Sequence, residues 1–568
     1  MYTSFLINSR FFLKNRTFLI LVFLWGVFLF GNVYPQNDNI NAGEEVYSFL
    51  KRMQVQGVIK GYDDTILPLT RKEIVDFLEN VEKNKSYMAE SDIAYLEFLK
   101  RKYIISKNCI NILDEFPEKF VHNLLTDSAK HLYQYLDSSF VLLVDPVLRY
   151  RYIYSSKLRN NSNLFELGGE VHGGYKDWFG FYAYGSNGFQ SGNRKTAELD
   201  KNVRDSYTFN ITGRNNFDFT NGYLNLVKDP FQIELGREQI LWGNGYINKM
   251  IISDNSQPFD FLKFQIRYKS LRYTFLHAWL VQEPFTIPIN DLYGSFKSKD
   301  SKYLAISRLE YKPWNSFQIS ASQLIIYSNR PLELAYLNPF MFWESAQRSL
   351  NDLDNSFLAF GSRILPGRGF ELGGNIIFDD INFDKLFKGK WAGINNGSGW
   401  QIGGFFTYPL LWKQTDIKIE YMQLRPFLYS HPGLPGALTY TNNGRLIGAD
   451  LEPNSTRLSI EGDYRVISAL KATLGFQYTL HGNNIVDENG NLIRNFGGNV
   501  FQPVTINDPE YAYLLKGDLE KEMKIYSEIE YRLLFGYYLV IHFEYTYLHA
   551  NPVENSVNLW GQFKLSFN

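Results

Sequence analysis

The sequence has almost no cysteine, since Cys109 is the only one among 568 residues. A single thiol excludes an internal disulfide framework and any zinc cluster built from cysteines. The sequence also has no large excess of charge of one sign, because its 58 Lys and Arg residues are balanced by 59 Asp and Glu residues. This balance gives no electrostatic reason to expect a nucleic-acid partner.

Long apolar runs are missing after the first 36 residues, so no later stretch approaches the length of a transmembrane helix. The one apolar run, from Thr17 to Gly31, follows three basic residues and is followed directly by a proline and polar residues. This order is typical of a secretory signal. We therefore expect residues 1–36 to be a signal peptide. If the mature chain enters a membrane, it does so as strands.

Aromatic residues are abundant, with 46 Phe, 39 Tyr and 10 Trp, while charged residues still make up 21% of the chain. A transmembrane β-barrel needs this combination, because aromatic girdles sit at both membrane interfaces and polar groups line the lumen. The composition favours such a barrel. A soluble all-β protein stays open as the alternative at this point.

Residues 37–138 predict a small helical domain, which we expect on the periplasmic side and without chemistry of its own. Thr70 and Glu73 form a capping-box pattern, in which each side chain satisfies a backbone N–H at a helix start. Apolar residues with i, i+3, i+4 and i+7 spacing predict the helix faces. These residues are Val46, Phe49, Leu50 and Met53, then Ile74, Phe77, Leu78 and Val81, and more loosely Ile93, Leu96, Leu99 and Tyr103.

From about Ser139 the hydrophobic period changes to two. In residues 537–548, Leu539, Ile541 and Phe543 alternate with His542 and Glu544. Short connections alternate with long ones along the chain, as periplasmic turns and outer loops do in outer-membrane barrels. Counting them predicts about eighteen antiparallel strands over residues 139–568. The stretch 205–213 also alternates but breaks this count, so we place it inside a long outer loop.

Candidate cofactor and metal motifs are weak. Gly243-Asn244-Gly245 lacks the Lys and Ser/Thr of a nucleotide-binding loop, so its glycines better fit a strand turning over at the barrel rim. The eight histidines show no paired metal spacing, and we expect His277 and His542 to be hydrogen-bonded wall residues. We predict no cofactor and no metal. The acidic residues Asp379, Asp380 and Asp384 fit an acidic loop entry better than a calcium site.

One stretch resembles an enzyme motif. Tyr184-Gly185-Ser186-Asn187-Gly188 is similar to the Ser-Asn-Gly of outer-membrane phospholipases, whose nucleophilic serine follows a histidine two residues upstream. The base must reach the serine hydroxyl to activate it. Tyr184 stands at that position here. We therefore predict no enzyme and keep a lipid-active enzyme only as the weaker alternative, for which a base would have to come from another strand.

The segment LGREQILWGNGYINKMIISDNSQPF, residues 235–259, resembles the Wzi family of capsule-assembly outer-membrane proteins. The resemblance rests on Gly-Arg, Trp-Gly, an apolar pair, Ser-Asp-Asn and Pro-Phe in this order. Residues 336–340, Asp354-Asn355, residues 378–380 and the N-terminal helical stretch are similar to the family too. The resemblance implies an eighteen-stranded outer-membrane barrel with a periplasmic helical domain. It also implies a lectin-like activity that holds capsular polysaccharide at the cell surface without catalysis.

A binding site for sugar needs aromatic faces, amides and carboxylates in a concave place. One predicted outer loop, 242–259, supplies such groups, and the alternative is that they only tie this loop across the barrel mouth. The expected partners are capsular or surface polysaccharide and outer-membrane lipid. The chief rival function is a passive porin. The candidate site residues are Trp242, Asn244, Tyr246, Asn248, Asp254 and Asn255.

Overall fold

The computed structural model describes residues 35–568 except 212–213, 283–284, 291–293, 299–300, 353, 380–396, 409–413, 433–435, 509–511 and 551. Nearly all of the expected signal peptide, residues 1–34, lies outside the described residues. Within the part of the chain that is described, no helix is both long and apolar enough to cross a membrane.

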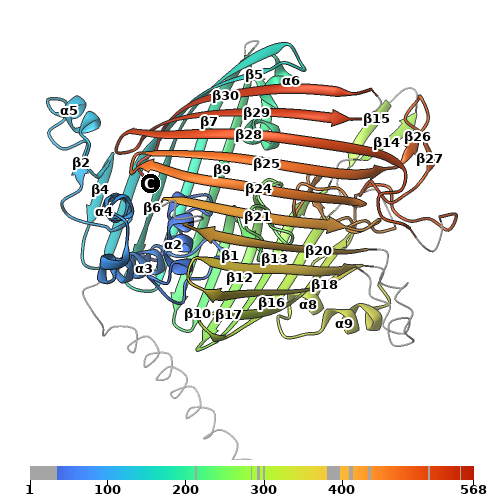
Figure 1. Ribbon diagram of the computed structural model, residues 1–568, viewed down its shortest axis with the longest axis horizontal. Coiled ribbons are helices and arrows are strands. Elements are labelled where there is room, and N and C mark those ends of the chain that lie inside the picture. Colours follow the sequence, from blue (N-terminus) through green and yellow to red (C-terminus); the bar gives the residue numbers. More distant parts are fainter. Residues whose placement is uncertain are drawn as a thin grey trace, which may run out of the picture.

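Eighteen antiparallel strands form a closed barrel, which confirms the predicted fold (Figure 1). The last strand pairs with the first, with Leu565 opposite Leu148 and Asn558 opposite Ser155. In ring order the strands are β5 (Phe140–Ser155), β6 (Asn160–Tyr175), β7 (Phe179–Gly192), β9 (Arg214–Lys228), β10 (Phe231–Glu238), β12 (Phe259–Tyr268), β13 (Leu271–Val281), β16 (Ser301–Trp314), β17 (Phe317–Ser328), β18 (Asn355–Gly367), β19 (Phe370–Asp379), β20 (Ser398–Thr407), β21 (Thr415–Leu424), β24 (Ser455–Ile467), β25 (Leu470–Asn483), β28 (Asp518–Leu534), β29 (Tyr537–His549) and β30 (Glu554–Leu565).

The period of two decides which side chains face out. On β29, Leu539, Ile541 and Phe543 are exposed on the outer wall, whereas His542 and Glu544 point into the lumen and contact polar residues of β28 and β30. Successive side chains of a strand lie on opposite faces, so an apolar–polar alternation gives an apolar outer wall and a polar lumen.

The two ends of the barrel differ in their connections. Residues 176–178, 229–230, 269–270 and 535–536 are short turns at one end, which we call the short-turn end. Most connections at the opposite, long-loop end are longer and carry small elements (Figure 1). These are α6 (Arg194–Ala197), α7 (Lys201–Asp205), β8 (Tyr207–Ile211), β11 (Leu241–Trp242), β14 (Phe285–Asn290), β15 (Gly294–Ser298), α8 (Leu334–Leu337), α9 (Trp343–Leu350), β22 (Thr441–Asn442), β23 (Arg445–Leu446), β26 (Ile485–Val486) and β27 (Leu492–Arg494).

Residues 35–103 form a plug in the short-turn end of the lumen (Figure 1). The predicted capping box is present, because the Thr70 side chain and the Glu73 side chain each accept from the other's backbone. The plug contains α2 (Glu45–Val55), β1 (Ile66–Leu67), α3 (Arg71–Lys83), a 3-10 turn (Lys85–Tyr87) and α4 (Glu90–Tyr103). The chain then continues through β2 (Ile110–Asn111), α5 (Phe120–Leu125), β3 (Lys130–His131) and β4 (Tyr133–Leu136) to β5.

Half of the lumen is filled by an apolar core. Residues 239–258, which we call the inner segment, turn into the barrel and pack with residues 428–429 and 438–451 against the inner faces of strands between β12 and β21. Leu304, Ile306, Leu324 and Ile326 are fully or almost fully buried there. The outer face of β13, β16 and β17 is also covered, because α8 and α9 pack on it through Tyr336 and Trp343 and neighbouring residues.

Candidate functional site

The inner segment does not lie on the outer rim, so the predicted position of this part of the site is wrong. Its strand β11 pairs with β1 of the plug, with Trp242 opposite Ile66 and Leu241 opposite Leu67. Trp242 has no exposed surface and exchanges backbone hydrogen bonds of 2.8 and 3.0 Å with Ile252. Because apolar residues line this side of the lumen, the segment gains more by burying its own apolar side chains there than by staying in water.

The Gly-Asn-Gly turn encloses a carboxylate of the protein itself. The backbone N–H groups of Tyr246, Ile247 and Asn248 donate to Glu420 on β21 at 2.7, 3.2 and 3.0 Å. Such a row of N–H groups is an anion-binding nest. Gly245 is needed for the tight turn, since a Cβ there would lie 1.9 Å from the carbonyl oxygen of Asn248. The nest is therefore satisfied internally.

Asn244, Tyr246 and Asn248 bind the barrel wall. The Asn244 side chain donates to the Gly374 carbonyl at 3.1 Å and accepts from Arg308 at 3.2 Å. The Tyr246 hydroxyl donates to Glu371 at 3.0 Å. Of these three residues Asn244 is buried, whereas Tyr246 and Asn248 are half-buried. Their polar groups tie the inner segment in place, which is the alternative role considered for them from the sequence.

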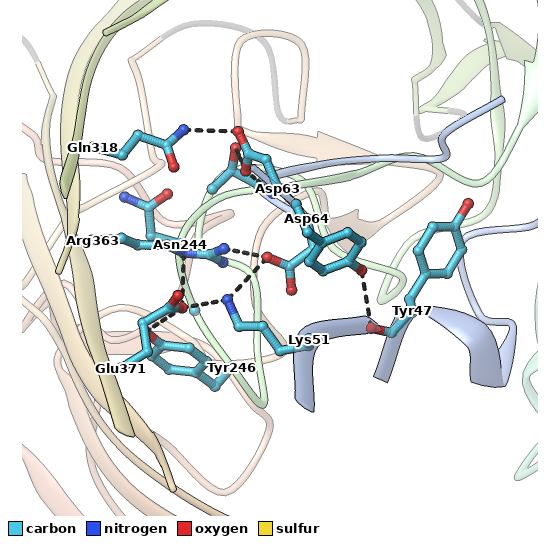
Figure 2. Close-up of polar contacts among 12 residues, drawn as sticks. Tyr47, Lys51, Asp63, Asp64, Asn244, Tyr246, Gln318, Arg363 and Glu371 are labelled. Carbon is cyan, nitrogen blue, oxygen red and sulfur yellow. Dashed lines mark hydrogen bonds and ion pairs between the residues drawn. The ribbon is translucent and has the colours of Figure 1, made fainter. Parts of the chain in front are cut away.

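A network of buried charges joins the plug, the inner segment and the wall (Figure 2). Lys51 of α2 pairs with Glu371, and Arg363 of β18 pairs with Asp64 of the plug. Burial alone would raise the pKa of Asp64, but the charges of Arg363 and Lys51 outweigh it and hold this pKa well below its usual range. Asp64 is therefore ionised and holds the plug against the wall.

Asp254 and Asn255 lie further along the inner segment, towards the long-loop end. Asp254 has a side chain that is 70% exposed and pairs with Lys201 of α7 at 2.9 Å. Asn255 is half-buried and donates to the Leu446 carbonyl at 3.1 Å. Of the six predicted site residues, only Asp254 is exposed and also lines an open space.

That space is a cavity of about 330 Å³ on the side of the lumen formed by β5, β6, β7 and β9. Tyr184, Phe219 and Asn221 contribute aromatic and amide groups, while Arg149 and Lys201 contribute positive charge. The Asn221 side-chain oxygen is buried and has no hydrogen-bond partner among the described residues. A concave space with aromatic, amide and charged groups has the chemistry of a sugar site.

A second cavity of about 510 Å³ shares Ala42, Gly43, Glu44 and Lys564 with the first and extends along β25 to β30. Its wall is charged through Lys471, Glu528, Glu530 and other residues. Further along this wall, His542 lies between Tyr526 and Trp560, with ring centroids 6.1 and 4.9 Å apart. This half of the lumen is hollow and lined by polar and charged groups, unlike the apolar half.

The remaining predicted residues have structural partners. The Ser186 hydroxyl donates to the Glu166 carboxylate at 2.8 Å rather than to a histidine. His277 lies on the outer wall under α8 and α9, where its Nε2 contacts the Tyr327 hydroxyl at 2.8 Å. Asp379 accepts from the Tyr429 N–H at 2.8 Å. Asp380 and Asp384 lie outside the described residues.

Several site residues were missed by the sequence reasoning. Glu420, Glu371 and Arg363 lie on wall strands, where polar inward residues look alike in sequence. One signal was available, because Leu304-Ala305-Ile306 and Leu324-Ile325-Ile326 are apolar without alternation. Continuous apolar runs are typical of strands that are covered on both faces. They point to a covering layer inside the barrel as well as outside it.

The profile of the family described as capsule assembly protein Wzi matches residues 133–537, which is more than half of the chain. This chain belongs to the Wzi family. The expected family membership is thereby confirmed.

Solved structures agree at the level of the fold. Wzi of Escherichia coli, described as an outer-membrane carbohydrate-binding β-barrel involved in group 1 capsule assembly, is 12% identical with a TM-score of 0.56. The match covers 93% of this chain and 99% of that one. OprD of Pseudomonas aeruginosa is 13% identical over 75% of this chain and 95% of its own, but its TM-score of 0.42 is too low to support a conclusion about the fold. No curated protein matches the sequence.

Proposed function

We propose that this Wzi-family protein is a lectin-like barrel that attaches surface polysaccharide to the cell and has no catalytic role. The observation that supports it best is the family match over residues 133–537 together with the carbohydrate-binding relative of the same fold. The short-turn end with the plug faces the periplasm in this proposal, and the long-loop end faces outwards, because outer-membrane barrels have short periplasmic turns.

The binding region proposed for the polysaccharide is the cavity that Asp254 lines. Its volume of about 330 Å³ lies at the lower end of the range for small-ligand sites, about 300–1,000 Å³. Asp254 can accept hydrogen bonds from sugar hydroxyls, the Asn221 amide lines the same space, and Tyr184 and Phe219 offer ring faces to the C–H surfaces of sugars. The charges in its lining are mixed, so the site suits a sugar that carries both neutral and charged groups.

The other predicted residues receive a supporting role in this proposal. Trp242, Asn244, Tyr246 and Asn248 hold the inner segment against the plug and the wall, and Asn255 fixes the segment beside residue 446. They set the position of Asp254 without touching the sugar. These contacts argue against a porin function. The plug and the inner segment occupy the lumen, through which ions would have to pass.

Two levels of the proposal can be tested separately. Deleting the gene should release surface polysaccharide into the medium while total polymer stays constant, since synthesis and export do not need a surface anchor. If the deletion strain retains its polysaccharide, the attachment function is wrong. This first test does not depend on which cavity binds the sugar.

The second level concerns the cavity. The double variant D254A/N221A removes two hydrogen-bonding groups, each of which contributes about 1 kcal/mol, or about fivefold in affinity. We expect several-fold more shed polymer than in the parent. The matched control is D260A, since Asp260 is an exposed carboxylate paired with Arg237 outside the lumen. Heat-modifiable migration on a gel checks assembly. Normal retention by an assembled double variant rejects this cavity.

A further inference from the structure

Three potential metal ligands meet in the lumen near the short-turn end. His131 lies on β3, just before the barrel, while Asp145 and His172 lie on the neighbouring wall strands β5 and β6. One ligand atom from each of the three lies within 4.8 Å of the other two. Asp145 and His172 have no exposed surface, and His131 is 9% exposed. The three residues are 14 and 27 positions apart along the chain, and such spacings do not indicate a metal site in a sequence.

His172 is oriented in the way that metal-binding histidines are. Its Nδ1 lies 3.0 Å from the Asp38 carboxylate, which in turn is held by Arg71 at 2.8 Å. If Nδ1–H donates to Asp38, the lone pair of Nε2 points the other way, towards Asp145. A carboxylate that accepts from the far ring nitrogen is the usual second partner of a metal-binding histidine, because it fixes the tautomer and the ring.

The contact between His172 and Asp145 is long for a hydrogen bond. Nε2 of His172 is buried and has no hydrogen-bond partner among the described residues, and it lies 3.5 Å from an oxygen of Asp145. A charge-assisted hydrogen bond would be about 2.7–2.9 Å long. Two ligands of one tetrahedral zinc, with bonds of about 2.0–2.2 Å, are about 3.3–3.6 Å apart. The observed spacing therefore matches two atoms on one cation better than two atoms on one proton.

The third ligand contacts the same carboxylate. Nδ1 of His131 lies 2.8 Å from the Asp145 oxygen, which is the length of a charge-assisted hydrogen bond, so a metal ion would have to replace this bond and open the distance by about 0.5 Å to the tetrahedral value. A further carboxyl group lies beside the three ligands, since the buried Glu170 is the cross-strand neighbour of Asp145. Its Oε1 is buried without a hydrogen-bond partner in the described part of the chain. The guanidinium of Arg71 binds Asp38 and Asn568 and also lies 3.3 Å from Nδ1 of His172.

We propose that His131, Asp145 and His172 bind one zinc ion, with water in the fourth position. Two imidazole nitrogens and one carboxylate oxygen form a donor set that zinc accepts readily, and thiolates are not required. The ion ties β3 to β5 and β6. It thereby fixes the link between the plug and the barrel wall, which is a structural role separate from polysaccharide attachment.

The test uses the full mature chain in detergent, without a histidine tag. After chelator treatment and addition of zinc, elemental analysis should find about one zinc per chain. Cobalt in place of zinc should give the visible absorption of a tetrahedral site. D145N and H172Q should each lose the bound metal. H542Q should keep it, because His542 is also a lumen histidine beside a carboxylate, Glu528, at 3.2 Å, but has no second histidine nearby in the described residues.

A zinc content of the parent no higher than that of D145N overturns the proposal, as does loss of the metal from H542Q. Should the D145N or H172Q barrel fail to assemble, the parent alone decides. In that case, absence of a cobalt spectrum and of any zinc-dependent rise in its melting temperature overturns the proposal. Both signals together support it. Unchanged polysaccharide retention in an assembled H172Q variant would show that the two proposals are independent.

Discussion

The backbone N–H of Tyr246 donates a 2.7 Å hydrogen bond to the carboxylate of Glu420, as the first of three consecutive N–H groups that do so. E420A should release the inner segment, because each buried donor left unsatisfied costs about 1–3 kcal/mol. E420Q, which keeps one acceptor oxygen, should release it less. Trypsin cleavage after Lys249 measures the release directly, since this bond lies inside the segment.

The control for this prediction is E461A. Glu461 is a lumen carboxylate on β24, but it binds Lys418 and the Tyr526 hydroxyl instead of the inner segment. Cleavage after Lys249 should stay at the parent level in E461A. Equal protection of E420A and the parent would show that the nest does not hold the segment.

Trp242 should stabilise the inner segment and its pairing with the plug, so replacing it should loosen both. The side chain is fully buried in the apolar core and its backbone pairs with β1. W242A should therefore cost about 3–5 kcal/mol, as large-to-small changes in cores do. Urea-dependent proteolysis of the inner segment is the measurement. W400A is the matched control, because Trp400 is 37% exposed on the outer wall and should lose far less.

The plug should keep the barrel closed to ions. Arg363 of the barrel wall binds Asp64 of the plug, and removing one partner of such a buried pair costs about 3–5 kcal/mol. We expect the parent to conduct little in planar bilayers and R363A to show frequent openings. R237A, which breaks the exposed pair with Asp260, should behave like the parent. Stable, large conductance of the parent would favour the porin.

Lys249 should make the packing of the inner segment pH-dependent. Burial lowers its pKa to about 7; Asp64 opposes this shift, whereas Arg363 and Lys51 add to it. Its amine donates to the Gly243 and Gly245 carbonyls at 3.0 and 2.8 Å. Between pH 7 and the unfolded value near 10.5, the unfolded chain binds the extra proton, so stability should rise with pH in this window.

The variant K249M should flatten that rise, because the titrating group is gone while the chain length is similar. The readout is the difference in melting temperature between parent and variant, followed from pH 6.5 to 10 by tryptophan fluorescence. Using the difference cancels the titration of the tyrosines that both proteins share. A difference that does not change with pH would show that Lys249 stays charged in the folded protein.

The sequence by itself determined the elements of this protein. A strict period of two, as at Leu539, Ile541 and Phe543, predicts a strand with one apolar and one polar face, because successive side chains of a strand point to opposite faces. The alternation of short and long connections then gave the number of strands, and the Thr70–Glu73 capping box gave a helix start. All of these are local patterns, so they can be recognised in the sequence without knowledge of tertiary contacts.

Only the tertiary structure decided what fills the lumen. Whether residues 239–258 point outwards or inwards depends on the apolar wall that Leu304 and Ile326 build from two distant strands. The same holds for Glu420 in its nest and for His131 of β3, Asp145 of β5 and His172 of β6, which come together from three separate strands. These contacts join residues far apart in sequence, and their free energy depends on burial that no local pattern records.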